Sequence, residues 1–134
     1  IGRAHVELEG SDVTIVAYSR MVGLALEAAA TLAGEGISAE VINLRSLRPL
    51  DTETIVASVK KTNRLISVEE GWPVAGIGAE IAAIAMEQAF DYLDAPVRRV
   101  CGADVPMPYA KNLEAMYMPG AGDIADAAKA VCYR

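Results

Sequence analysis

The chain alternates short β-branched runs with longer segments of helical periodicity, and this alternation limits the possible folds more than any other feature. Four runs have the length of buried strands: 12–18, 38–44, 64–70 and 96–102. Four segments carry apolar residues at helical spacing: 20–33, 52–61, 79–90 and 123–134. Such an order implies right-handed crossovers and an open, mainly parallel sheet with helices on both faces.

The expected helices also carry start and stop signals. Ser19 and Asp51 should open the first two helices, with a turn at Pro49, and Asp123 should cap the last one. Lysines close the second helix, where the helix dipole favours cations. The predicted inward-facing positions are Val22, Leu26, Ala29 and Ala33; Ile55, Val56 and Val59; Ile81, Ile84, Ala85 and Gln88; and Ile124, Ala127, Ala128 and Val131.

A further alternating segment, 4–10, precedes the first of these strands. Its last residue, Gly10, and Ser11 form the whole connection to the run at 12–18. A two-residue connection that contains glycine is typical of a β-hairpin. The local pattern alone therefore pairs these two segments.

Size and composition exclude several classes of protein. The 134 residues are 53% hydrophobic, which suits one domain with one core. The net charge of −6 argues against a surface that binds nucleic acid or anionic lipid. Cys101 and Cys132 lie far apart and a zinc site is not expected, while His5 is interpreted as a satisfied or solvent-facing side chain. No signal peptide or membrane-spanning run is apparent, and Ile1 in place of methionine favours a piece of a longer protein.

Candidate chemistry belongs at the carboxyl ends of the parallel strands. The glycines of "GIG" at 76–78 could cradle a phosphate, but Ile81 stands where the third glycine of a dinucleotide motif would be, so close strand–helix packing is the alternative reading. Glu69 and Glu70 should face opposite sides of an extended segment. Their expected role is a salt bridge to Arg45 or Arg48 rather than acid–base catalysis.

Three classes of function can be compared with this pattern. A phosphoacceptor receiver domain needs an acidic cluster where this chain has Tyr18, Ser19 and Arg20. A nucleotide- or flavin-binding module needs a phosphate loop that 71–78 only half supplies. A non-catalytic assembly domain of a larger enzyme predicts a good core and an exposed apolar loop. Residues 102–120, rich in proline, methionine and tyrosine, fit this third class.

Several strings together resemble a known family. "IGRAHVE", "LRSLRPLD", "SVKKTNRLISVEEGWP", "LDAPVRRV" and "GADVPMPYAKNLE" are similar to the C-terminal, transketolase-type domain of the pyruvate dehydrogenase E1 component β subunit. The resemblance covers essentially the whole chain, 1–134, as a single domain without the N-terminal pyrimidine-binding domain. The last string is typical of the pyruvate branch rather than of the branched-chain 2-oxoacid enzymes.

The resemblance implies a three-layer α/β/α fold with a mixed five-stranded sheet in the order 1-3-2-4-5. The first strand would be antiparallel to the rest, so that 4–9 lies beside 39–43. It also implies a subunit of a mitochondrial-matrix α2β2 enzyme that uses thiamine diphosphate and magnesium to decarboxylate pyruvate and reductively acetylate the lipoyl group of E2. That reaction feeds acetyl-CoA synthesis. No catalytic, cofactor or metal residue carries over to this chain, so the domain alone is expected to be inactive.

The resemblance further points to two contact surfaces. The loop would pack in the β–β and α–β contacts through Pro106, Met107, Pro108, Tyr109, Met116 and Tyr117. The alternative is a lid over its own sheet. A small basic helical domain of E2, the peripheral subunit-binding domain, would dock at Asp94, Tyr133 and Arg134. The alternative for Asp94 is a cap of its local turn.

Overall fold

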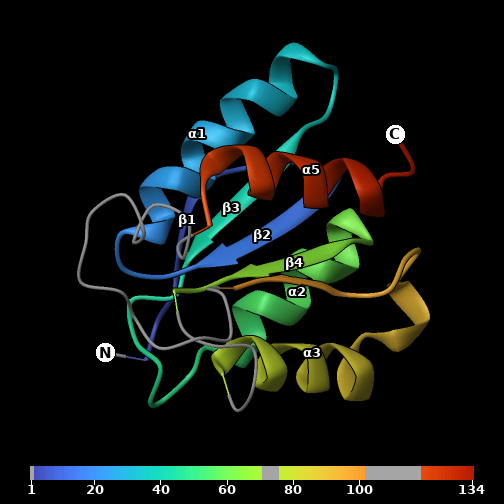
Figure 1. Ribbon diagram of the computed structural model, residues 1–134. Helices are drawn as coiled ribbons and strands as arrows, with labels where there is room; N and C mark the ends of the chain where they lie inside the picture. The colour runs from blue at the N-terminus through green and yellow to red at the C-terminus, as the bar shows by residue number, and fades with distance from the viewer. Residues whose placement is uncertain (1, 71–75, 102–118) are drawn as a thin grey trace.

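A single mixed sheet organises the chain. The computed structural model describes residues 2–70, 76–101 and 119–134 (Figure 1). Five strands are hydrogen-bonded in the order β1-β3-β2-β4-β5. Their bounds are β1 His5–Leu8, β2 Val13–Ala17, β3 Ala39–Asn43, β4 Leu65–Val68 and β5 Arg98–Val100. The strand order and the α/β class expected from the resemblance are confirmed.

Helices cover both faces of this sheet, which gives the three layers seen in Figure 1. Their bounds are α1 Met21–Gly34, α2 Thr52–Thr62, α3 Ile77–Gln88, the short 3-10 helix η1 Phe90–Tyr92 and α5 Ala121–Val131. The pair α1 and α5 packs on one face around Ile15, while α2 and α3 pack on the other around Val16. Alternate residues of β2 thus enter opposite cores, and all five of its residues are buried. None of the helices in the described ranges combines the length and the apolar run needed to cross a membrane.

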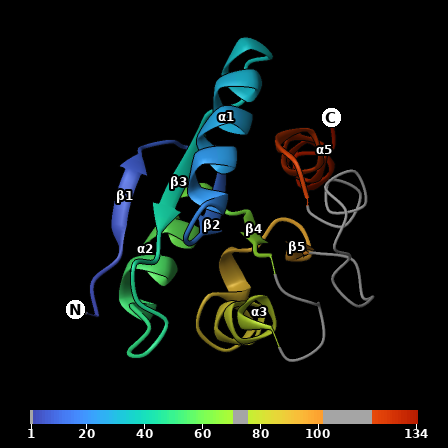
Figure 2. The same ribbon diagram turned by 60° about the vertical axis from the view of Figure 1, so that its left-hand side comes forward.

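Strand β1 lies at the edge of the sheet, beside β3 and not beside β2 (Figure 2). It runs antiparallel to β3, with His5 opposite Asn43 and Val6 opposite Ile42. The hairpin predicted from the local pattern is therefore wrong. Tight hairpin turns need a positive φ at a central residue, and Gly10 and Ser11 are not among the residues with positive φ.

The helix boundaries follow the sequence with small corrections. Asp51 caps α2 as predicted and accepts a hydrogen bond from the Thr54 N–H at 3.1 Å. Ser19 does not open α1: it has a left-handed φ of 57° and α1 begins two residues later. Asp123 lies in the first turn of α5, where it accepts from the N–H of the N-cap residue Gly120 at 2.8 Å.

Most of the predicted inward positions are buried. Two are wrong: Ala33 and Gln88 are exposed, while the neighbouring Leu32 and Ala89 are buried instead. Leu26 and Val56 are half-buried at the edges of the two cores. Each error is a shift by one residue, which turns a side chain by about 100° around a helix.

Candidate functional site

At the carboxyl end of β4, a buried carboxylate is bound to the start of α3. Glu69 is only 2% exposed, and its Oε2 accepts a hydrogen bond from the Gly78 N–H. Burial raises the pKa of Glu69, opposed by this hydrogen bond and by the nearby Arg99. The helix N-terminus that could have held a phosphate therefore binds a carboxylate of the same chain.

Close packing accounts for glycine at position 78. A Cβ there would lie 2.6 Å from the Glu69 Oε2 and 2.7 Å from the Ser67 Oγ. Both distances are shorter than real Cβ contacts allow, so a larger residue at position 78 would force Glu69 or Ser67 to move. This supports the packing reading of the "GIG" string over the phosphate reading.

The expected salt bridge from Glu69 or Glu70 to Arg45 or Arg48 is wrong. Glu70 instead pairs with Arg20, whose Nε lies 3.2 Å from its Oε1. The strand order explains the difference, because the arginines follow β3 and the glutamates follow β4, with β2 between them. Strands two places apart are separated by about 9–10 Å, whereas Arg20 follows the adjacent strand.

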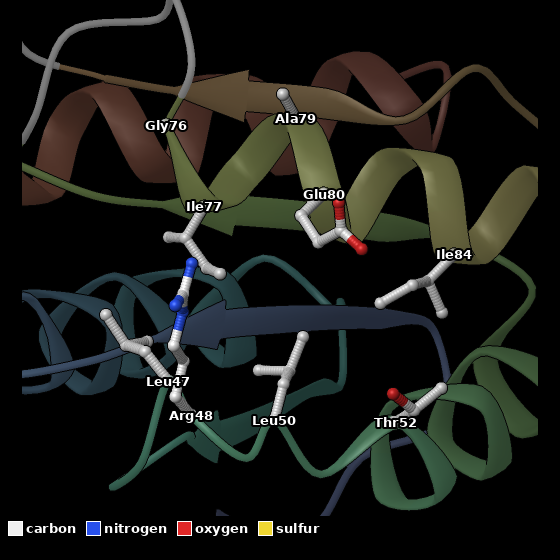
Figure 3. Close-up of a pocket in the computed structure, with 9 residues that line it drawn as sticks. All are labelled: Leu47, Arg48, Leu50, Thr52, Gly76, Ile77, Ala79, Glu80 and Ile84. Atoms are coloured by element: carbon white, nitrogen blue, oxygen red, sulfur yellow. The ribbon is translucent and has the colours of Figure 1, made fainter.

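An open groove lies between the segment after β3 and helix α3. Figure 3 shows Arg48 reaching from one wall toward Ile77 on the other, with Leu50 beside Arg48 on the same wall. Its lining also includes Glu80 and Ile84 from α3. The groove measures about 820 Å³ and mixes apolar walls with two charged side chains of opposite sign.

The residues predicted to bind E2 lie at the opposite end of the sheet, where the parallel strands begin. Figure 1 shows the end of α5 and the segment after α3 at this same end. Tyr133 donates a hydrogen bond from its hydroxyl to the Asp94 carbonyl at 3.1 Å. The structure thus brings Asp94 and Tyr133 together. Arg134 points elsewhere, with its guanidinium near Gly36 beyond the end of α1.

The Asp94 side chain is well exposed. Its carboxylate lies 3.9 Å from Arg64 Nη2, and the side chain is 58% exposed. The backbone of Asp94 is held separately, since its N–H donates to the Asn63 carbonyl at 2.9 Å. No hydrogen bond from the local turn to the carboxylate is found among the described residues. The turn is therefore held by backbone groups, and the carboxylate faces solvent beside one arginine.

Arg64 is the residue of this surface that the sequence reading missed. Its Nε donates to the Val131 carbonyl at 3.1 Å, and its Nη1 donates to the Asp12 carbonyl at 3.1 Å. It thereby joins the end of α5 to the start of β2 beside Asp94. The sequence around Arg64 did not indicate this role, because its three partners come from segments that are distant along the chain.

The other predicted residues have simple surroundings. His5 is exposed on β1, as expected. Cys101 and Cys132 are free thiols, and burial raises the pKa of each. Within the described ranges, no three His, Cys, Asp or Glu side chains group as a metal site would require. The predicted interface residues of the loop, which run from Pro106 to Tyr117, lie outside the described residues.

A five-stranded α/β/α domain with this strand order belongs to the fold class of the transketolase C-terminal domains. Residues 2–124 match the family described as "Transketolase, C-terminal domain", and the chain belongs to that family. Within it, the chain is 65% identical over all 134 residues to "Pyruvate dehydrogenase E1 component subunit beta-2, mitochondrial" of Oryza sativa subsp. japonica. The resemblance predicted from the quoted motifs is confirmed.

Other similar proteins are also named as E1 β subunits. The identity is 65% over 134 residues to the mitochondrial E1 β subunit of Dictyostelium discoideum and 57% over 132 residues to the E1 β subunit of Rickettsia felis. The chain spans 36% of the rice protein, 38% of the Dictyostelium protein and 40% of the Rickettsia protein. It therefore corresponds to well under half of each relative.

Solved structures give the same fold. The chain is similar to a chain titled "Split gene transketolase, inactive beta4 tetramer", with a TM-score of 0.86 and 36% identity, covering 98% of this chain and 42% of that one. It also matches a 2-oxoglutarate:ferredoxin oxidoreductase from Magnetococcus marinus, with a TM-score of 0.65 and 17% identity, covering 97% of this chain and 20% of that one. The second likeness concerns the fold alone.

Proposed function

We propose that this chain is the assembly and E2-docking domain of a pyruvate dehydrogenase E1 β subunit located in the mitochondrial matrix. The observation that carries the proposal is the identity of 63–65% over all 134 residues to five E1 β subunits whose names place them in mitochondria. The whole enzyme would be an α2β2 tetramer that decarboxylates pyruvate and reductively acetylates the lipoyl group of E2, which feeds acetyl-CoA synthesis.

The docking part of the proposal is supported by the corner around Asp94. Its carboxylate is exposed, its backbone is fixed by Asn63 and Tyr133, and it can pair with a lysine or arginine of a basic partner. Tyr133 belongs to this surface through its bond to Asp94. Arg134 points away from Asp94, so its part in docking rests on the resemblance alone.

The assembly part of the proposal concerns the loop from Pro106 to Tyr117. Its prolines would limit the entropy lost on packing against a neighbouring subunit, and its methionines and tyrosines are residue types common in interfaces. The similar split-gene transketolase chain is described by its title as an inactive β4 tetramer. By analogy, this domain would contribute subunit contacts while the chemistry is completed by other domains.

The described residues do not fit thiamine diphosphate. They hold no cluster of acidic or histidine side chains suited to magnesium, and the N–H of Gly78 at the start of α3 is bound to Glu69. The resemblance implies that the cofactor would be held between the α subunit and the N-terminal domain of the β subunit.

Asp94→Ala should weaken E2 binding by about 2–5 kcal/mol if the carboxylate forms a desolvated ion pair with the partner. The measurement is a titration of the purified E2 subunit-binding domain into the α2β2 enzyme at physiological salt. Glu27→Ala removes the same charge from the exposed face of α1 and serves as the control. Equal affinities of the wild-type and Asp94→Ala enzymes would remove Asp94 from the docking surface.

The isolated domain should bind no thiamine diphosphate, because its buried carboxylates are engaged within the fold. Calorimetric titration of the cofactor with Mg²⁺ into the folded domain should give no heat of binding, whereas the α2β2 enzyme should bind it. Micromolar affinity of the domain by itself would place the cofactor site in this chain and contradict the proposal.

A further inference from the structure

Two polar side chains at the end of β4 are buried against helix α3. Ser67 and Glu69 are only 1% and 2% exposed, and they lie two residues apart on the extended chain, so they point to the same face of the sheet. The Glu69 Oε2 accepts a hydrogen bond from the Gly78 N–H in the first turn of α3. The Ser67 Oγ, by contrast, is the one buried side-chain polar atom without a hydrogen-bond partner among the described residues. An unsatisfied buried hydroxyl carries a free-energy cost that a nearby donor could remove.

The oxygens of Ser67 and Glu69 border the same small space beside Gly78. A Cβ built on Gly78 would lie 2.6 Å from the Glu69 Oε2 and 2.7 Å from the Ser67 Oγ. The two oxygens are therefore close enough that a rotation of either side chain can bring them into hydrogen-bond distance. The backbone beneath them is fixed, since the Glu69 N–H donates to the Val100 carbonyl at 3.0 Å. Such a contact thus requires only side-chain movement.

The surroundings of Glu69 favour a neutral carboxyl group. Within the described ranges, no lysine, arginine or histidine forms an ion pair with it. The charged and titratable groups around it in those ranges are one cation, two weak acids and one neighbouring ion pair: Arg99, Tyr18, Cys101, and Glu70 with Arg20. Burial raises the pKa of Glu69, although the Gly78 hydrogen bond and the charge of Arg99 oppose it. A buried carboxylate without a paired cation is costly, and a proton removes that cost.

We propose that Glu69 and Ser67 form a proton-dependent latch that holds the start of α3 on the sheet. In the protonated state, the Glu69 hydroxyl donates to the Ser67 Oγ while its carbonyl oxygen keeps the Gly78 N–H. Loss of the proton removes the donor, and the first contact is broken. A group whose pKa is raised in the folded state stabilises the fold below its unfolded pKa, and this stabilisation is lost as the pH rises through the folded pKa. Because α3 also forms one wall of the groove, proton uptake fastens that wall.

The test is amide hydrogen exchange in the full-length protein that contains this chain, measured by mass spectrometry on peptides from α3 over a pH series and corrected for intrinsic exchange. Exchange at the start of α3 should be about threefold to tenfold slower below the folded pKa of Glu69 than above it, as one hydrogen bond implies. Glu69→Gln should be slow at every pH, because its amide always offers both a donor and an acceptor. Ser67→Ala should move the step to lower pH, since the protonated form loses its acceptor. Glu87→Gln, on the exposed face of α3, is the matched control and should follow wild type.

Three results would overturn the latch. The first is corrected exchange at the start of α3 that does not change with pH in wild type, and the second is a step that persists in Glu69→Gln. The third is a step that moves to higher pH in Ser67→Ala, because the hydroxyl would then donate to the ionised carboxylate instead of accepting from the acid. If Glu69→Gln does not fold, the direction of the step in Ser67→Ala decides by itself. None of these results bears on the proposed docking and assembly functions.

Discussion

Gly10→Ala is expected to lower the free energy of unfolding by more than about 3 kcal/mol, or to prevent folding. A Cβ at Gly10 would lie within 3.0 Å of backbone atoms of both Ala39 and Glu40. Backbone atoms in the middle of a sheet cannot move aside as a flexible side chain can. The crossing of the chain from β1 to β2 over the start of β3 therefore requires glycine at this position.

Urea denaturation of the wild-type and variant domains measures this effect. Gly23→Ala is the matched control, because a Cβ at Gly23 in α1 meets no atom within 4 Å. This control should be unchanged or slightly more stable, since alanine favours the helix. A Gly10→Ala domain as stable as wild type would mean that the chain passes β3 by another path.

Glu40→Ala should cost roughly 3 kcal/mol of stability, because it leaves buried hydrogen-bonding groups without their partner. The Glu40 side chain is 3% exposed and pairs with Lys61. It also accepts from the Ser58 hydroxyl at 2.6 Å and from the Gly10 N–H at 3.2 Å. It thus ties β3 both to α2 and to the segment that precedes β2. Glu35→Ala, which removes an exposed partner of Lys129, should have little effect.

The stabilisation by Glu40 should depend on pH in a defined direction. Burial raises the pKa of its carboxyl, but the hydrogen bonds from Lys61, Ser58 and Gly10 outweigh burial and hold the pKa below the ordinary value of 4.5. A group whose pKa is lowered in the folded state stabilises the fold at pH values above its unfolded pKa. This stabilisation is lost as the pH falls through the folded pKa. Glu40→Gln should therefore differ most from wild type above pH 4.5 and approach it in acid. A difference that does not change with pH would contradict the role of the charge.

The layers of the fold were predictable from the sequence, whereas the position of one strand was not. Strands buried on both faces leave unbroken apolar runs, and the runs in β2 and β4 gave the parallel sheet directly. The position of β1 came from the resemblance. The local signal at Gly10 indicates a hairpin, because glycine suits a tight turn as well as it suits close packing against a backbone.

The candidate site, like the fold, could be predicted only in part. Asp94 and Tyr133 came from the resemblance, and the structure places them in contact. Asn63 and Arg64, which hold this corner together, act through backbone carbonyls that any residue type could provide, so their sequence positions gave no signal. The predicted ion-pair partner of Glu70 was wrong because ion pairing depends on strand order, which the sequence periodicity does not specify.

The most direct test of the proposed function is decarboxylation of 2-oxoacids by the full-length polypeptide that contains this domain, co-expressed with an E1 α subunit. The rate is measured with an artificial electron acceptor, without E2, for pyruvate and for a branched-chain 2-oxoacid. An E1 β subunit of the pyruvate branch predicts turnover that requires both chains and thiamine diphosphate, with pyruvate the better substrate. Failure of the two chains to assemble, or a preference for the branched-chain substrate, would contradict it.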